Sequence, residues 1–75
     1  MLTPLEYRLL DYLMLNAGQI LPFDEIIRHV WSTEYGDRDT LRQLIRRLRT
    51  KIEPDPAQPT LIETVPALGY GLNKF

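Results

Sequence analysis

The most informative stretch of this chain is DTLRQLIRRLRTKIE, residues 39–53. Its apolar residues recur at helical spacing and fall within roughly 100° of one another around a helix axis: they are Leu41, Leu44, Ile45, Leu48 and Ile52. The opposite side carries Gln43, Arg46, Arg47 and Thr50, with Arg42 and Arg49 on one flank of the apolar stripe and Lys51 on the other. The pattern predicts a helix with one buried face and one basic face, the latter about three turns long.

The predicted helix carries most of the positive charge of the chain. Residues 38–51 hold six of the nine Lys and Arg residues and a single acid, although the whole chain has a net charge of −1. A local positive field on an acidic body can still bind a polyanion. No Asp or Glu lies between residues 40 and 52, so we expect no ion pairing within the helix to neutralise the basic face.

The chemistry of the basic face suits nucleic acid. The arginine fork matches phosphate oxygens and the guanine edge in the major groove, and Gln43 can form a bidentate pair with adenine. A solvated face, paired with acids from elsewhere in the chain, is an equally good interpretation of the charge pattern alone.

Two more helices are predicted before this one. Thr3, Pro4 and Glu6 form the start signal of a helix over residues 4–16, and Gly18 can take the positive φ of a helix end. A second helix is predicted at 23–31, after a short extended connection at 19–22. Residues 32–38 are predicted to form a polar loop.

The C-terminal part predicts a β-hairpin. Three prolines between residues 54 and 59 indicate a stiff surface loop. Residues 60–65 are β-branched and strand-like, and a turn at 66–69 lets the chain return, so we expect a hairpin over about 60–74. Residues 1–75 are therefore expected to form one domain, mostly α, of three helices and a small hairpin.

Several classes of function are not expected. The chain has no cysteine and one histidine, His29, so neither a disulfide framework nor a metal site is predicted. No apolar run is long enough to span a membrane, and no secretory signal is present, which favours the cytoplasm. No nucleophile or acid–base pair can be assembled, so we expect neither an enzyme nor a cofactor.

Four motifs occur in a distinctive order: residues 2–10 (LTPLEYRLL), Val30-Trp31, residues 45–49 (IRRLR), and residues 62–65 (IETV) followed by Gly69-Tyr70. Together they resemble the effector domain of OmpR/PhoB-type bacterial response regulators. The resemblance covers nearly the whole chain. It implies a winged helix-turn-helix fold, sequence-specific binding of double-stranded DNA and regulation of transcription within a two-component phosphorelay system.

The resemblance also implies a set of contacts. The third helix would enter the major groove, with Arg46, Arg47 and Arg49 touching bases or phosphates and with Trp31 and Thr64 touching the phosphate backbone. The complete predicted DNA-binding set is Thr40, Arg42, Gln43, Arg46, Arg47, Arg49, Thr50, Trp31 and Thr64. Trp31 also closes an apolar helix face, which favours a place in the core.

The implied partners extend beyond DNA. Family members usually bind tandem half-sites as homodimers and are controlled by a phosphorylated receiver domain. The loop at 32–38 often faces RNA polymerase in this family, and Tyr35 could then be an exposed contact. Tyr35 could equally pack the loop down.

Three departures from the family pattern bear on function. The chain begins at the first helix, without the usual N-terminal four-stranded sheet, so we expect either a fragment or an abbreviated member. Pro66 and Gly71 stand where basic residues are common, and Asp39 stands where Arg is common. We expect weaker DNA binding than is typical, or a different contact pattern. The alternative is a winged-helix protein-interaction module whose basic helix docks on an acidic partner.

Overall fold

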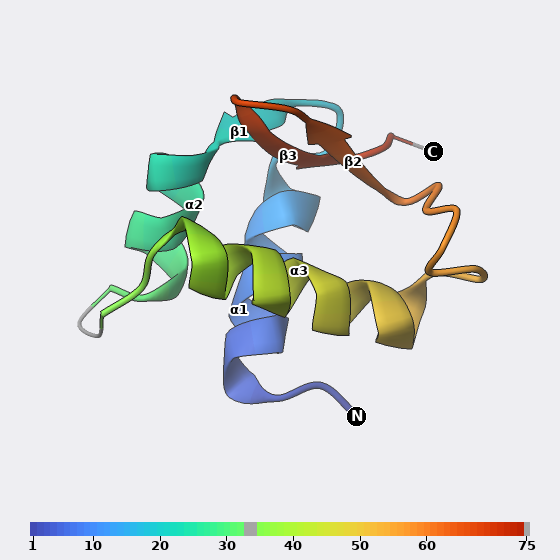
Figure 1. Ribbon diagram of the computed structural model, residues 1–75, viewed down its shortest axis with the longest axis horizontal. Coiled ribbons are helices and arrows are strands. Elements are labelled where there is room, and N and C mark those ends of the chain that lie inside the picture. Colours follow the sequence, from blue (N-terminus) through green and yellow to red (C-terminus); the bar gives the residue numbers. More distant parts are fainter. Residues whose placement is uncertain (33–34, 75) are drawn as a thin grey trace.

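A computed structural model describes residues 1–32 and 35–74 of the chain. The elements are α1 (Pro4–Leu15), β1 (Ile20–Pro22), α2 (Phe23–Val30), α3 (Arg38–Ile52), β2 (Ile62–Val65) and β3 (Gly69–Leu72). The long helix α3 crosses in front of α1, with α2 at one end and the sheet along one edge (Figure 1). None of the described helices is long and apolar enough to cross a membrane.

The helix ends follow local capping. The predicted box at α1 is present: Thr3 Oγ1 accepts from the Glu6 amide, and Glu6 Oε1 accepts from the Thr3 amide. Gly18 takes a φ of 88° just beyond this helix, as expected. The predicted bounds 4–16 and 23–31 each end one residue too late, and the predicted bounds 39–53 are one residue too late at both ends. The start of α3 was predicted too late because Asp37 caps it, accepting from the Thr40 amide at 2.8 Å.

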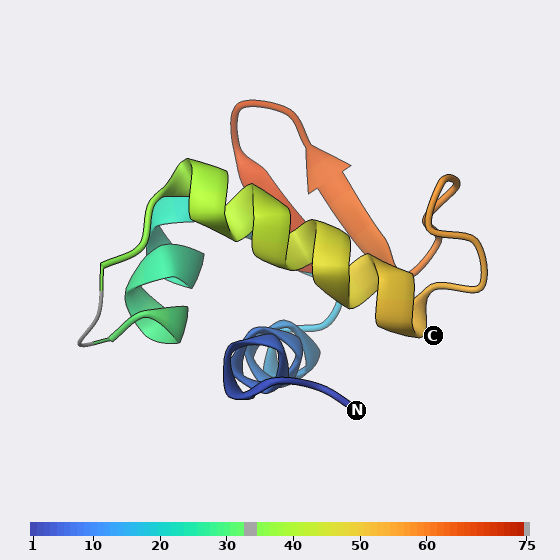
Figure 2. The ribbon, with the colours of Figure 1, turned by 60° about the horizontal axis from the view of Figure 1, so that its bottom comes forward.

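The core lies between the three helices and the sheet. The predicted apolar stripe of α3 is confirmed: four of its residues, Leu41, Leu44, Ile45 and Leu48, are buried, and Ile52 is partly buried against the core. They pack with residues from every other element: these are Leu9, Leu13, Leu21, Ile26, Val30, Ile62, Tyr70 and Leu72. One face of α3 is thereby held fixed, and its opposite face is left toward solvent (Figure 2).

The sheet has three strands, in the order β1–β3–β2, and all pairs are antiparallel. The prediction that residues 19–22 are only an extended connection was wrong, because Ile20–Pro22 pairs with β3. Sequence periodicity cannot identify a strand of three residues. A Cβ at Gly69 would lie 1.8 Å from the Leu21 carbonyl oxygen, so glycine permits this close pairing. We call β2, β3 and the turn between them the hairpin.

Candidate nucleic-acid interface

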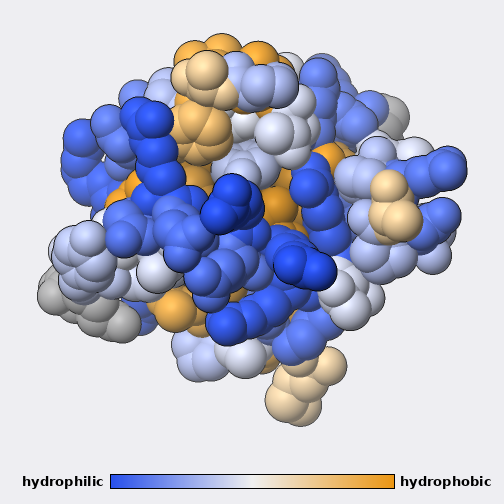
Figure 3. All heavy atoms as spheres, viewed as in Figure 1, coloured by the Kyte–Doolittle hydropathy of each residue, from blue (hydrophilic) through white to orange (hydrophobic). Residues whose placement is uncertain are grey.

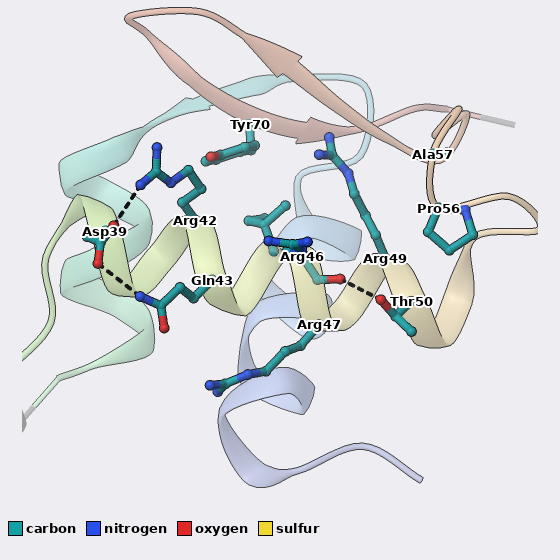
Figure 4. Close-up of a pocket in the computed structure, with 11 residues that line it drawn as sticks. Asp39, Arg42, Gln43, Arg46, Arg47, Arg49, Thr50, Pro56, Ala57 and Tyr70 are labelled. Atoms are coloured by element: carbon teal, nitrogen blue, oxygen red, sulfur yellow. Dashed lines mark hydrogen bonds and ion pairs between the residues drawn. The ribbon is translucent and has the colours of Figure 1, made fainter.

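An open groove runs along the exposed face of α3. The hairpin bounds it at Tyr70, and the loop after α3 bounds it at Pro56 and Ala57 (Figure 4). Its lining also contains Asp39, Arg42, Gln43, Ile45, Arg46, Arg47, Arg49 and Thr50. Hydrophilic side chains gather along this face (Figure 3). Four arginines against one acid make the groove cationic, which suits a polyanion.

Arg46 and Arg47 are the groove cations that have no partner among the residues that the structure describes. Both side chains are exposed, and neither guanidinium takes part in a hydrogen bond or ion pair with the described residues. Arg47 points away from the sheet, whereas Arg46 lies between Arg42 and Arg49 in the view of Figure 4. Two unneutralised guanidinium groups remain on this surface, and each can donate a fork of hydrogen bonds to phosphate or to a base edge.

Arg49 and Thr64, two of the predicted DNA contacts, are bonded to each other. Arg49 Nη2 donates to Thr64 Oγ1 at 2.7 Å and to the Ile62 carbonyl at 2.9 Å. The Arg49 Nε atom is buried without a hydrogen-bond partner among the described residues. Arg49 therefore connects α3 to the hairpin by hydrogen bonds and also adds positive charge to the groove.

Arg42 and Gln43 share one acid. Asp39 Oδ1 accepts from Arg42 Nη2 at 2.8 Å, and Asp39 Oδ2 accepts from Gln43 Nε2 at 2.9 Å. The expectation that no pairing within the helix neutralises the basic face was therefore wrong for Arg42. The error came from discounting Asp39, which lies one position outside the acid-free range and three residues before Arg42.

The two remaining cations of residues 38–51, Arg38 and Lys51, lie at the ends of α3. Arg38 Nε is 4.0 Å from Asp24 Oδ1, and its guanidinium lies 5.0 Å from the Phe23 ring centroid. Lys51 Nζ donates to Glu6 Oε1 at 2.6 Å. This hydrogen bond and the Thr3 amide hold the pKa of Glu6 below its ordinary value. Lys51 thus links α3 to α1 and does not extend the groove.

The other predicted contacts have structural partners. Thr40 Oγ1 donates to the Asp37 carbonyl at 2.9 Å and accepts from the Asp37 amide. Thr50 Oγ1 donates to the Arg46 carbonyl at 3.0 Å. Trp31 is 9% exposed and lies in the core, as its apolar helix face predicted. A Cβ on Gly36 would overlap the Trp31 ring, so the backbone at Gly36 lies directly on the indole.

Glu53 is a positioning residue that sequence reasoning missed. Its buried carboxylate accepts from the backbone amides of Thr60, Leu61 and Ile62. Burial raises the pKa of Glu53, but these amide bonds and the nearby charge of Arg49 outweigh it and leave the pKa lowered. The carboxylate closes the proline-rich loop and places β2 beside α3. Only its place before Pro54 set Glu53 apart in the sequence.

The loop expected to face RNA polymerase is partly described. Residues 33–34 of the predicted range 32–38 lie outside the described residues. Tyr35 is 82% exposed and donates through its hydroxyl to Asp37 Oδ2 at 3.1 Å. This bond to a carboxylate raises the pKa of Tyr35. The interpretation that Tyr35 packs the loop down is therefore wrong.

The helices, the basic face of α3 and the adjacent hairpin define a winged helix-turn-helix domain, in which the hairpin is the wing. A family described as "Transcriptional regulatory protein, C terminal" matches residues 1–72. The chain belongs to this family, the OmpR/PhoB-type DNA-binding domain of response regulators. It is a class of transcription-regulator domains and not of enzymes.

Named relatives and solved structures agree with this assignment. The sensory transduction protein RegX3 of Mycobacterium leprae is 48% identical over 68 residues, covering 89% of this chain and 34% of the relative. The DNA-binding dual master transcriptional regulator RpaA of Synechocystis is 46% identical over 72 residues, covering 95% of this chain and 30% of the relative. The chain thus spans about a third of the length of these relatives.

The structural likeness is equally clear. The DNA-binding domain of Escherichia coli CadC superposes with a TM-score of 0.86 at 33% identity, covering 96% of this chain and 68% of that one. The Thermotoga maritima response regulator DrrB, an OmpR/PhoB homologue, gives a TM-score of 0.85 at 28% identity, covering 99% of this chain and 34% of that one. The predicted family and fold are confirmed.

Proposed function

We propose that this chain binds double-stranded DNA with α3 in the major groove and that Arg46 and Arg47 carry the principal contacts. The observation that supports this most strongly is that two arginine side chains of α3 are not neutralised by the described part of the chain. Arg38, Arg42, Arg49 and Lys51 each have an internal partner, whereas Arg46 and Arg47 have none among the described residues. Both lie side by side on the exposed face of α3, opposite the buried stripe.

The remaining predicted contacts have supporting roles. Gln43 would reach a base edge, and the Thr50 hydroxyl would form a hydrogen bond near the phosphate backbone of the DNA. Arg49 would keep Thr64 and the hairpin beside the groove, so that backbone contacts from the hairpin reach the same duplex. Phosphate contacts of this kind position the domain, and base contacts supply its sequence preference.

A proposal about the setting of the domain draws on the names of its relatives. We infer that it is the effector part of a cytoplasmic two-component response regulator that acts on transcription. The same proposal includes three partners. They are a phosphorylated receiver domain, a second copy of the chain on tandem DNA sites, and RNA polymerase, which would contact the loop at 32–38. The names of the relatives as regulators and sensory transduction proteins support this proposal.

A salt titration tests the proposed contacts. Binding to a labelled duplex of random sequence is measured by fluorescence anisotropy at several salt concentrations, for the wild type and for Arg46→Ala/Arg47→Ala. Affinity should fall with rising salt, and removing each side chain that binds a phosphate should reduce the log–log slope by about 0.9. Arg28→Ala, an exposed arginine on α2, is the matched control. Unchanged binding by the double variant would contradict the proposal.

A second candidate is a protein-interaction module. Pro66 stands in the hairpin turn where the family commonly has a basic residue, Leu68 is exposed beside it, and the chain as a whole has a net charge of −1. A folded chain that does not bind duplex DNA even at low salt would favour this alternative.

A further inference from the structure

Asp39 is the one acidic side chain among the described residues that line the groove of α3. A carboxylate in a DNA-binding surface repels phosphate, so electrostatic attraction to DNA does not explain the presence of Asp39 in this groove. Its place in the first turn of α3 gives a modest favourable interaction with the helix dipole. An acid elsewhere in that turn would supply the same benefit, and the hydrogen bonds of Asp39 point to a more specific role.

The Asp39 carboxylate holds two neighbouring side chains at once. One oxygen accepts from Arg42 Nη2 at 2.8 Å and the other accepts from Gln43 Nε2 at 2.9 Å. A glutamine amide has a donor end and an acceptor end of similar size, and it can exchange them by half a turn. Because a carboxylate only accepts, Asp39 selects the orientation in which Gln43 Nε2 faces it. The Gln43 oxygen then points away from Asp39 (Figure 4).

The fixed orientation of Gln43 determines which base edges it can meet. In the major groove, adenine and cytosine present an amino donor, whereas guanine and thymine present carbonyl acceptors at the corresponding positions. An outward amide oxygen accepts from the amino group and is repelled by the carbonyl. The second hydrogen on Gln43 Nε2 remains available for N7 of adenine.

We propose that Asp39 is a positioning residue that fixes Gln43 to read an amino base, adenine above all, at one position of the DNA site. The inference rests on the proposed function, because it requires α3 to face the major groove. Asp39 also draws Arg42 away from phosphate. Its removal should therefore raise general affinity for DNA while it weakens discrimination at one base pair, and a purely structural role would not produce that combination.

Selection from a pool of random duplexes tests this assignment. The wild type, Asp39→Asn and Gln43→Ala are each used to enrich bound DNA, which is then sequenced, and affinity for the unselected pool is measured at several salt concentrations. Asn at this position keeps the size of the side chain and offers both a donor and an acceptor, so it no longer holds Gln43 in one orientation. Asp11→Asn, which removes an exposed acid of α1, is the control for charge.

The expected result is local to one position. The wild type should enrich adenine over guanine and thymine there by roughly tenfold, as a good bidentate contact allows. Asp39→Asn and Gln43→Ala should both lose that preference and keep the others. Asp39→Asn should also bind the unselected pool more tightly than Asp11→Asn does.

Two results would overturn the assignment, and they are distinguishable. If the wild type binds duplexes with the expected salt sensitivity but Asp39→Asn keeps every base preference, the positioning role is wrong and the proposed function stands. If the folded wild type shows no salt-sensitive binding to the pool, the proposed function and the role of Asp39 are both wrong.

Discussion

Arg49 of α3 donates a hydrogen bond of 2.7 Å to the hydroxyl of Thr64, 15 residues later in the hairpin. The same nitrogen donates to the Ile62 carbonyl, so one guanidinium contacts both the backbone and a side chain of β2. The angle between α3 and the hairpin therefore depends on a charge-assisted contact as well as on apolar packing. Both parts of the proposed DNA surface are aligned by a residue that sequence reasoning assigned to DNA alone.

Removing the hydrogen bonds between Arg49 and β2 should destabilise the hairpin. We expect Arg49→Ala to lower the free energy of unfolding by about 1–3 kcal/mol, since two acceptors lose a charged donor. Thr64→Val keeps the β-branched shape and should cost less, about 0.5–1.5 kcal/mol. Chemical denaturation measures both values, and amide exchange in β2 should quicken with Arg49→Ala. Arg28→Ala is the control, and equal stability of all three variants would show that these hydrogen bonds contribute nothing.

The Glu53 carboxylate should be the main support of the proline-rich loop. Glu53→Ala leaves the amide of buried Ile62 without its acceptor, and we expect a loss of about 1–3 kcal/mol in the free energy of unfolding. Glu53→Gln keeps one acceptor oxygen and should cost less. Exposed Glu63 in β2 offers the control, because Glu63→Ala should change stability by no more than about 0.5 kcal/mol. A similar cost for Glu53→Ala and Glu63→Ala would contradict this role.

Stability should fall in acid. The pKa values of Glu6 and Glu53 lie below their ordinary value of 4.5 in the folded chain. A lowered pKa means that the folded state binds the proton more weakly than the unfolded state does. The stabilisation is therefore complete above pH 4.5 and is lost as the pH falls through the folded-state values. The variant Glu6→Gln/Glu53→Gln should show a smaller decrease when denaturation is followed from neutral to acid pH, and an unchanged decrease would refute the assignment.

Of the two hairpin positions where the family commonly has basic residues, Pro66 and Gly71, only Pro66 should accept a cation without loss of stability. Pro66 is exposed in the turn, and Pro66→Arg should steepen the log–log salt dependence of DNA binding by about 0.9 if the new side chain reaches a phosphate. Gly71→Arg should instead destabilise the chain by about 1–3 kcal/mol, because a Cβ there would lie 2.4 Å from the Gln19 carbonyl oxygen. Anisotropy and thermal unfolding separate the two effects. Normal stability of Gly71→Arg would show that the backbone at Gln19 moves aside at little cost.

Sequence reasoning recovered the elements that have strong periodicity. The stripe from Leu41 to Leu48 and the capping box at Thr3 are local patterns, and the structure confirms both. The strand at Ile20–Pro22 was missed because its evidence is the partner strand, which lies about 50 positions later in the chain and leaves no local period.

The site was predicted at the level of its helix and not of its individual bonds. Periodicity placed Arg46 and Arg49 on the same helix, but it could not show that Arg49 would find Thr64 while Arg46 would find no partner among the described residues. That distinction depends on where the hairpin returns, which is a tertiary property. The carboxylate of Glu53 was missed for the same reason, since its amide partners belong to a segment whose path no local rule specifies.

Mapping the bound surface by NMR tests the central claim most directly. Amide shifts of the isotope-labelled chain are followed as a duplex of random sequence is added at low salt. The largest changes should fall on α3 between residues 42 and 50 and on the hairpin turn, with little change on the exposed face of α1. Changes centred on α1, or binding that leaves α3 unaffected, would contradict the assignment of α3 as the DNA-binding helix.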